Sequence, residues 1–279
     1  MATHNQVREV GYLLKEPKIM NEGMEGSEKI LFKIRTIRRE TEGYYGKKFE
    51  DVIIYYDGID LMPKLKSLKR FDLVDIKGVF NVLTVDKRSR CPACGGQNTK
   101  YRGSSTFIYP IFITKINSLA SIFDRDADSP EMYLEKHWTE VSNQALIIGT
   151  VVNEPELLTF PHMQCCRYML GVNRKYYIKT QDELTSDYPW VYSYGQQAEW
   201  DIRHLRKEAV ILVDGFIHNR QVDANITCEH CGAAYTYPDV TTEFVPYSLE
   251  YLSGHKTDED IAIEEEVMKY EAMSGTGGM

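Results

Sequence analysis

The sequence predicts a mainly β protein in which two five-stranded barrels follow one another along the chain. One observation is an internal repeat: a Gly-x-x-x-x-Glu-Pro segment occurs at 11–17 and again at 149–155, and each copy is followed by a C-x-x-C pair. The proline precedes the first cysteine of its pair by 74 positions in one copy and 73 in the other. This agreement in spacing indicates two copies of one domain. The other observation is that most of each copy alternates between apolar and polar residues or is rich in β-branched and aromatic residues, which favours strands.

The expected elements occur in the same order in both copies. In the first copy, residues 1–117, we expect strands at 8–17, 29–39, 49–58, 73–86 and 105–116. A short helix is expected at 62–72, where Met62, Leu65 and Leu68 have helical spacing. In the second copy, residues 145–252, we expect strands at 145–153, 165–177, 190–195, 209–220 and 241–252, and a helix at 196–207. Three strands, a helix and two strands make up the plan of the five-stranded OB-fold barrel.

Two acidic segments lie outside the copies. Residues 118–144 are expected to form a helical linker, because Ser129 and Pro130 suit the N-cap and the first position of a helix. Residues 253–279 form an acidic tail that is predicted to be flexible, with a short helix over 259–273 as the alternative.

Composition excludes several classes of protein. With 43% apolar and 27% charged residues, the chain is neither a disordered protein nor a fibre. It has no run of 18 apolar residues and its start does not resemble a secretory signal, so no membrane association and a cytoplasmic location are expected. The net charge of −8 by itself argues against a general nucleic-acid binder. However, the first copy carries +7, the linker −4, the second copy −6 and the tail −5, so a polyanion is expected to bind the first copy.

The second copy resembles the bacterial single-stranded DNA-binding protein family. Residues 146–157 resemble its opening strand, and Tyr168-Met-Leu-Gly-Val-Asn-Arg174 resembles its second strand. Trp190 and then Val213-Asp-Gly215 follow in the family's order. In the more divergent first copy, residues 32–38 match the second-strand motif, and Phe49 and Tyr55 match aromatic positions of the third strand. This chain departs from the family in its fused copies, its C-x-x-C pairs and a tail that ends Thr-Gly-Gly-Met.

The resemblance implies a protein that binds single-stranded DNA, and the first copy offers the residue types that this requires. Cations contact phosphates, and exposed aromatic rings stack on bases. Half of the aromatic residues are expected to face the core, because alternation sends every other side chain inward. The expected DNA-binding residues are Lys33, Arg35, Arg38, Arg39, Phe49, Tyr55, Phe80, Lys87, Arg88, Arg90, Tyr101 and Arg102 of the first copy, and Arg174, Trp190 and Tyr194 of the second.

Two C-x-x-C pairs supply four thiols. Structural zinc takes four ligands in a tetrahedron, so Cys91, Cys94, Cys228 and Cys231 are expected to converge on one structural zinc per chain. Two half-sites completed by a second chain, a contribution from His230, and a redox pair remain as alternatives. The adjacent Cys165 and Cys166 fall at core positions of a predicted strand and are expected to be inert.

These observations predict a non-enzymatic protein that coats or organises single strands in DNA replication, recombination or DNA transfer. No phosphate-binding loop, zinc-protease or serine-hydrolase motif is present in the sequence. A protein-interaction scaffold of a replication or transcription assembly and an RNA-binding OB protein are the alternatives. By the resemblance, replication or recombination proteins could bind the acidic tail, and the chain could form oligomers.

Overall fold

The structure is a computed structural model that describes residues 4–24, 26–41, 44, 46–120, 129–160, 163–174 and 185–274, without the side chains of 84–86, 99–104, 160 and 271–274. The first half contains β1 (His4–Leu13), β2 (Lys18–Met20), β3 (Lys29–Ile37), β4 (Phe49–Tyr56), α1 (Met62–Lys66), β5 (Asp72–Arg90) and β6 (Gln97–Ser118). The helix α3 (Pro130–His137) follows. The second half contains β7 (Asn143–Val151), β8 (Glu156–Phe160), β9 (Met163–Asn173), β10 (Ser186–Asp187), β11 (Trp190–Tyr194), α4 (Gly195–His204), β12 (Val210–Thr227), β13 (Ala234–Ser253) and α5 (Asp258–Ser274).

In each half, five strands pair in a closed circuit. In the first circuit, β1 pairs with β3, β3 with β4, β4 with β6, β6 with β5, and β5 with β1. The second circuit repeats this order with β7, β9, β11, β13 and β12. The one parallel pairing of each circuit joins equivalent strands, β4 with β6 and β11 with β13. The mainly β class and the expected order of strands are therefore confirmed.

A repeated glycine allows two strands of each circuit to approach closely. A Cβ atom on Gly78 would lie 2.4 Å from the carbonyl oxygen of Tyr109, and one on Gly215 would lie 2.3 Å from that of Val245. Both glycines lie at a shift of register between the paired strands. Any side chain would push the partner strand away at these bends, so glycine is required at this position of the repeat.

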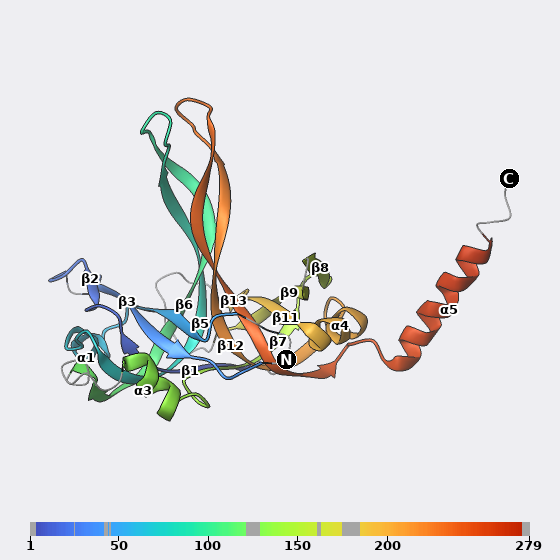
Figure 1. Cartoon of the computed structure of the whole chain (residues 1–279), viewed down its shortest axis with the longest axis horizontal. Helices are drawn as coiled ribbons and strands as arrows, with labels where there is room; N and C mark the ends of the chain where they lie inside the picture. Colours follow the sequence, from blue (N-terminus) through green and yellow to red (C-terminus); the bar gives the residue numbers. More distant parts are fainter. Residues whose placement is uncertain are drawn as a thin grey trace.

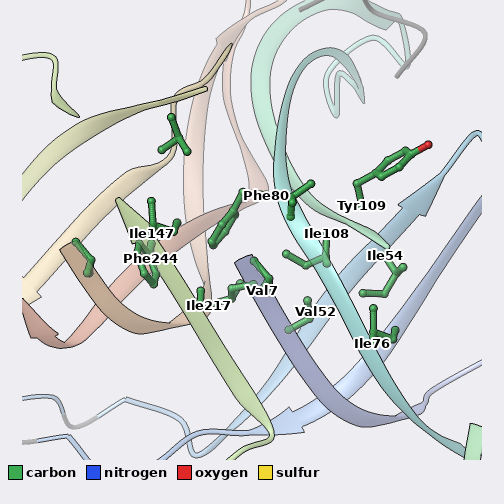
Figure 2. Close-up of a cluster of buried hydrophobic side chains, with 14 of the residues drawn as sticks. Val7, Val52, Ile54, Ile76, Phe80, Ile108, Tyr109, Ile147, Ile217 and Phe244 are labelled. Atoms are coloured by element: carbon green, nitrogen blue, oxygen red, sulfur yellow. The ribbon is translucent and has the colours of Figure 1, made fainter. Parts of the chain in front are cut away.

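The two circuits share one sheet and one core. Strand β1 pairs antiparallel with β7, with Val7 opposite Ala145, and this pairing joins all the strands of the described residues into one 13-stranded sheet. A single hydrophobic cluster contains Val7 and Phe80 from the first half and Ile147 and Phe244 from the second (Figure 2). The rings of Phe80 and Phe244 have their centroids 5.5 Å apart. The halves are thus held together by burial of apolar side chains from both.

Two long hairpins project from the body side by side (Figure 1). They are the distal parts of β5–β6 and β12–β13, and we call residues 87–98 together with 222–239 the arm. In the arm, the Lys87 ammonium lies 2.6 Å from the Asp239 carboxylate, and the Asn98 amide donates to the Tyr235 hydroxyl at 2.6 Å. The four predicted strands of these hairpins, 73–86, 105–116, 209–220 and 241–252, are shorter than the strands in the structure. Contacts between the hairpins extend the strands almost to the cysteines.

The helices agree with the sequence to different degrees. As predicted, α3 begins after Ser129, whose side chain accepts a hydrogen bond from the Met132 N–H at 3.3 Å. Helix α1 spans only Met62–Lys66 of the predicted 62–72, and β5 begins at Asp72. The described part of the tail contains the α5 helix, which extends away from the body (Figure 1). The alternative of a helix in this segment is the one that the structure adopts.

Candidate metal centre and nucleic-acid interface

Four cysteine sulfur atoms meet at the end of the arm. The Sγ atoms of Cys91 and Cys231 are 3.9 Å apart, those of Cys94 and Cys228 are 3.6 Å apart, and all four lie within 4.8 Å of one another. In a tetrahedral zinc site with Zn–S bonds of about 2.3 Å, neighbouring sulfur atoms are about 3.8 Å apart. The predicted convergence of the two pairs is confirmed, and the cluster could hold one metal ion within a single chain.

Each cysteine pair forms the same turn. Gly95 and Gly232 both have φ of 72°, a left-handed conformation that suits glycine. The turn brings backbone N–H groups to the sulfur atoms: the Gly96 N–H lies 3.4 Å from Cys94 Sγ, and the His230 N–H lies 3.4 Å from Cys228 Sγ. Such donors stabilise thiolates, which are the form that binds a metal.

The thiols of Cys228 and Cys231 influence each other's ionisation. Partial desolvation opposes ionisation of Cys228, but the N–H groups of Cys231 and His230 and the neighbouring thiols outweigh this and lower its pKa. The Ala233 N–H favours ionisation of Cys231, but the Cys94 and Cys228 thiols outweigh it and raise its pKa. By contrast, burial of Cys165 raises its pKa to about 12, and burial also raises the pKa of Cys166. The adjacent pair therefore has the inert character expected of core cysteines.

The structure bears on two of the alternatives to a four-cysteine metal site, a contribution from His230 and a redox pair. The His230 ring lies beside Gly96 and its Nε2 atom is 3.1 Å from the Gln97 carbonyl oxygen, so this histidine contacts the opposite hairpin instead of joining the four sulfur atoms. Both pairs lie at the ends of hairpins. A redox pair of the Cys-Pro-x-Cys type is typical of helix N-termini, so the structural context favours a metal.

Three adjoining hollows cross from the first circuit to the second, and we call them together the groove. The first hollow, of about 550 Å³, lies over β3 and β4 and is lined by Lys33, Phe49 and, from β12, Asn219. The second, of about 430 Å³, shares Lys47, Asn219 and Gln221 with the first. The third, of about 420 Å³, shares Tyr194 with the second and continues along α4. The groove is thus built by both halves of the chain.

The charged groups of the first hollow divide into exposed and paired ones. Lys33 and Lys47 are exposed. The Arg35 guanidinium instead lies 2.8 Å from the Asp51 carboxylate and 2.8 Å from that of Glu131, and this pairing raises its already high pKa. The Arg35 charge is therefore neutralised within the protein, whereas the two lysines remain available to an anion in the groove.

Among the predicted aromatic residues, Phe49 lies in the groove and is half-buried. Tyr55 is also half-buried and faces outward from β4, with its ring 5.6 Å from that of Phe107 and its hydroxyl donating to Asp57 at 3.1 Å. Trp190 is half-buried, with the Arg167 guanidinium 5.1 Å above its ring.

Two predicted stacking residues are buried instead. Phe80 is 1% exposed because its ring packs on Phe244 between the two halves (Figure 2). Tyr194 is 8% exposed and packs 5.0 Å from Tyr44, which reaches it from the β3–β4 connection. For both, the outward position that the sequence suggested is covered by the other half of the chain. Tyr194 still borders the groove, but Phe80 has no ring face open to a base.

Two predicted phosphate contacts are structural as well. The buried Arg38 guanidinium donates to the carbonyl oxygens of Arg39, Gly46 and Lys47 at 2.7–2.9 Å, and so holds the β3–β4 connection together. Arg174 forms a buried ion pair with Asp187 at 2.7 Å. Both guanidinium groups are occupied by acceptors of this chain, so the structure presents neither of them to a phosphate.

The remaining predicted cations lie at the contact between the halves or on the arm. Arg39 pairs with Asp214 at 3.2 Å, and Lys87 pairs with Asp239 at 2.6 Å. Arg88 and Arg90 are exposed on the arm. The side chains of Tyr101 and Arg102 lie outside the described residues. Part of the charge difference between the copies is therefore used within the molecule, where basic residues of the first half face acidic residues of the second.

Sequence reasoning missed Lys47, Asn219 and Gln221 as groove residues. The Lys47-Lys48 pair directly before the aromatic Phe49 could have indicated the first. No pattern in the sequence marks the two amides, because they enter the groove through the arrangement of the two halves.

Comparison with known proteins agrees with this description. Residues 142–231 match the model of the single-strand binding protein family. Single-stranded DNA-binding protein 2 of Clostridium acetobutylicum is 30% identical over 84 residues, which are 29% of this chain and 62% of that protein. The chain thus spans less than two thirds of the length of this curated relative.

The fold is also found among solved structures. The crystal structure of the single-stranded DNA binding protein from Thermus aquaticus has a TM-score of 0.58 at 16% identity, over 92% of this chain and 97% of that one. A deletion mutant of the same protein has a TM-score of 0.57 over 92% and 98%. None of the helices in the described ranges is long and apolar enough to cross a membrane. Residues 142–231 therefore carry the sequence pattern of the single-strand binding protein family, within a fold that nearly the whole chain shares with the Thermus aquaticus protein.

Proposed function

We propose that this chain binds single-stranded DNA along the groove and coats or organises exposed strands in replication, recombination or DNA transfer. The observation that carries the proposal is that three hollows built by both halves adjoin one another through shared lining residues, with exposed Lys33 and Lys47 and the half-buried ring of Phe49 at one end. Such a combination of cations and rings suits a flexible polyanion with unpaired bases. The family match of residues 142–231 and the name of the Clostridium relative support the same function.

The test is titration of the full-length protein with poly(dT), poly(U) and duplex DNA over a salt series. We expect the tightest binding for poly(dT), with the logarithm of the binding constant falling linearly against the logarithm of the salt concentration. Equal or tighter binding of poly(U) would favour an RNA-binding protein. Absence of binding to any single strand would overturn the proposal.

We further propose that the two circuits are tandem OB-fold barrels, 1–117 and 145–252, connected by the linker 118–144 and followed by the tail 253–279. One structural zinc bound by Cys91, Cys94, Cys228 and Cys231 would join their hairpins. The sulfur spacing and the repeated turns support this metal, since four thiolates in a closed tetrahedron are typical of structural zinc.

A second candidate is a protein-interaction scaffold, which the exposed α5 helix favours. This helix carries acidic residues in its first turn and exposes Ile263, Val267 and Tyr270 at helical spacing. The two candidates predict different results for a variant that lacks 258–279: a DNA-binding protein keeps its affinity for poly(dT), whereas a scaffold loses its partners.

A further inference from the structure

The third hollow of the groove contains an exposed tryptophan that is held in a fixed position. Trp200 of α4 is 49% exposed and lines the hollow together with Tyr251. The indole stacks on His204, with ring centroids 5.0 Å apart and 16° between the planes. His204 in turn stacks on Tyr251, at 5.6 Å and 19°. The rings on one side orient the indole, so its binding of a ligand would cost little conformational entropy.

Polar groups beside the indole are held in place too. The Gln197 amide and the Tyr251 hydroxyl both donate to the buried Asp201 carboxylate, each at 2.8 Å. The neighbouring Gln196 is exposed and lines the hollow. A side-chain amide carries both donors and an acceptor, which match the edge of a nucleobase. The hollow thus combines a flat apolar surface with hydrogen-bonding groups.

The third hollow adjoins the second. Tyr194 lines both of them, so a strand bound in the second hollow lies next to the one along α4. Thr41, from the connection between β3 and β4, also lines the third hollow. Close by, the Arg39 guanidinium lies 4.0 Å from the centre of the Tyr247 ring, which forms part of the lining. The Arg39 guanidinium also pairs with Asp214 at 3.2 Å, so at this point the described lining offers ring faces and no unpaired cation.

We infer that the third hollow is a subsite for a nucleobase of the bound single strand, and that the base stacks on Trp200. The inference rests on the proposed function. The proposed function places DNA contacts on the strands of the first hollow. This inference adds a contact on the α4 helix, at the end of the groove opposite Lys33. The indole offers its exposed face to the base, and Gln196 offers its amide to the edge of the base.

Tryptophan emission tests this contact directly, because the chain has three tryptophans, Trp138, Trp190 and Trp200. In the full-length double variant Trp138→Phe/Trp190→Phe, all tryptophan emission comes from Trp200. We expect an oligo(dT) that saturates the protein to quench this emission. An abasic oligonucleotide of the same length, which supplies phosphates without bases, should leave it nearly unchanged.

Affinity gives a second and independent test. We expect Trp200→Ala to weaken binding of oligo(dT) roughly tenfold without changing the salt slope, since one stacked base is lost and no phosphate contact. Trp200→Phe keeps an aromatic face and should weaken it less. Circular dichroism of each variant checks that the fold is retained, and the emission experiment leaves Trp200 itself unchanged.

The outcomes separate this inference from the proposed function. Suppose that oligo(dT) binds, that it does not quench the Trp200 emission, and that Trp200→Ala binds it as tightly as the parent. The subsite is then refuted and the DNA-binding function stands. Emission that changes with protein concentration in the absence of DNA would assign the hollow to a second copy of the chain instead. If no single strand binds at all, both proposals fail.

Discussion

At the scale of single residues, exposure in the assembled molecule decides which cations can meet a phosphate. Lys33 and Lys47 are exposed in the groove, whereas the Arg38 guanidinium is surrounded by backbone carbonyl oxygens. We expect Lys33→Ala and Lys47→Ala each to reduce the salt slope of poly(dT) binding by about 0.7. Lys77, which is exposed on β5 and does not line the groove, is the matched control.

Substitution of Arg38 should affect the stability of the protein and not its salt-dependent DNA binding. Arg38→Ala removes hydrogen bonds to the β3–β4 connection, so it should lower the melting temperature and leave the salt slope unchanged. A reduced slope in this variant, or an unchanged slope in both lysine variants, would show that the phosphates follow another path. Sequence alone could not separate these residues: Arg38 and Lys33 belong to the same predicted strand, 29–39, and only the fold of the β3–β4 connection buries one of them.

A second residue-scale prediction concerns Glu9. This side chain is fully buried on β1, and neither of its carboxyl oxygens has a hydrogen-bond partner among the described residues. Burial, together with nearby Glu50, raises the pKa of Glu9 well above 4.5. The folded protein therefore holds a proton that the unfolded chain releases, so the stability that Glu9 contributes is fully present below the unfolded pKa and declines as the pH rises.

Glu9→Gln removes this dependence because glutamine is neutral at every pH and has a similar shape. At pH 8 we expect the variant to be more stable than the parent, since a buried carboxyl whose pKa is raised loses stability as the pH rises and the amide does not. The difference should shrink as the pH approaches 4. Denaturant unfolding at several pH values measures it, with Glu22→Gln as an exposed control. Parallel pH profiles for Glu9→Gln and the parent would contradict the buried protonated state.

At the scale of elements, the arm shows which strands the alternation of apolar and polar residues can predict and which it cannot. Alternation predicted the strands of both circuits, and the spacing of the C-x-x-C pairs predicted that four thiols would meet. Alternation did not predict that the strands continue to the cysteines, because the distal parts of the hairpins gain their contacts from each other. The Lys87–Asp239 and Asn98–Tyr235 contacts join positions 152 and 137 residues apart in the sequence.

The arm also sets the expected result of losing the metal. The β1–β7 pairing and the shared core join the halves independently of any metal, so losing the zinc should not release one half from the other. Cys91→Ser and Cys228→Ser should therefore cause the same loss of zinc and faster amide exchange in the arm, while exchange in the circuits stays slow.

Cys165→Ser is the control. It changes a buried core cysteine that is not one of the four clustered thiols, so this variant should keep the metal. Zinc content and hydrogen exchange on the same preparations make the comparison. Two zinc ions per chain, or full zinc affinity in either single variant, would mean that the pairs bind metal separately.

At the scale of the whole molecule, the internal repeat made the architecture predictable. Which site residues are exposed could not be predicted, because this depends on how the two repeats contact each other. Each copy could be recognised from its own sequence. The burial of Phe80, Tyr194, Arg38 and Arg174 depends on what the other half, or a neighbouring connection, places against them, and no local pattern contains that information. The same holds for Asn219 and Gln221, which enter the groove only because β12 lies beside β4 of the first half.

The shared core also changes the expectation for isolated halves. The +7 charge of the first copy predicts that this half binds DNA, and a fragment of residues 1–125 would isolate it. However, this fragment would expose Val7 and Phe80, which pack in one cluster with Ile147 and Phe244, and it would leave β1 without its β7 partner. An open strand edge beside newly exposed apolar surface favours self-association. We therefore expect 1–125 to aggregate or self-associate when expressed alone, and to bind poly(dT) strongly only when it is combined with 129–279. Sedimentation of each fragment and of the mixture, followed by DNA titration, measures this. A monomeric 1–125 with the affinity of the full chain would show that the first half forms a complete binding unit and that the groove across both halves is not needed.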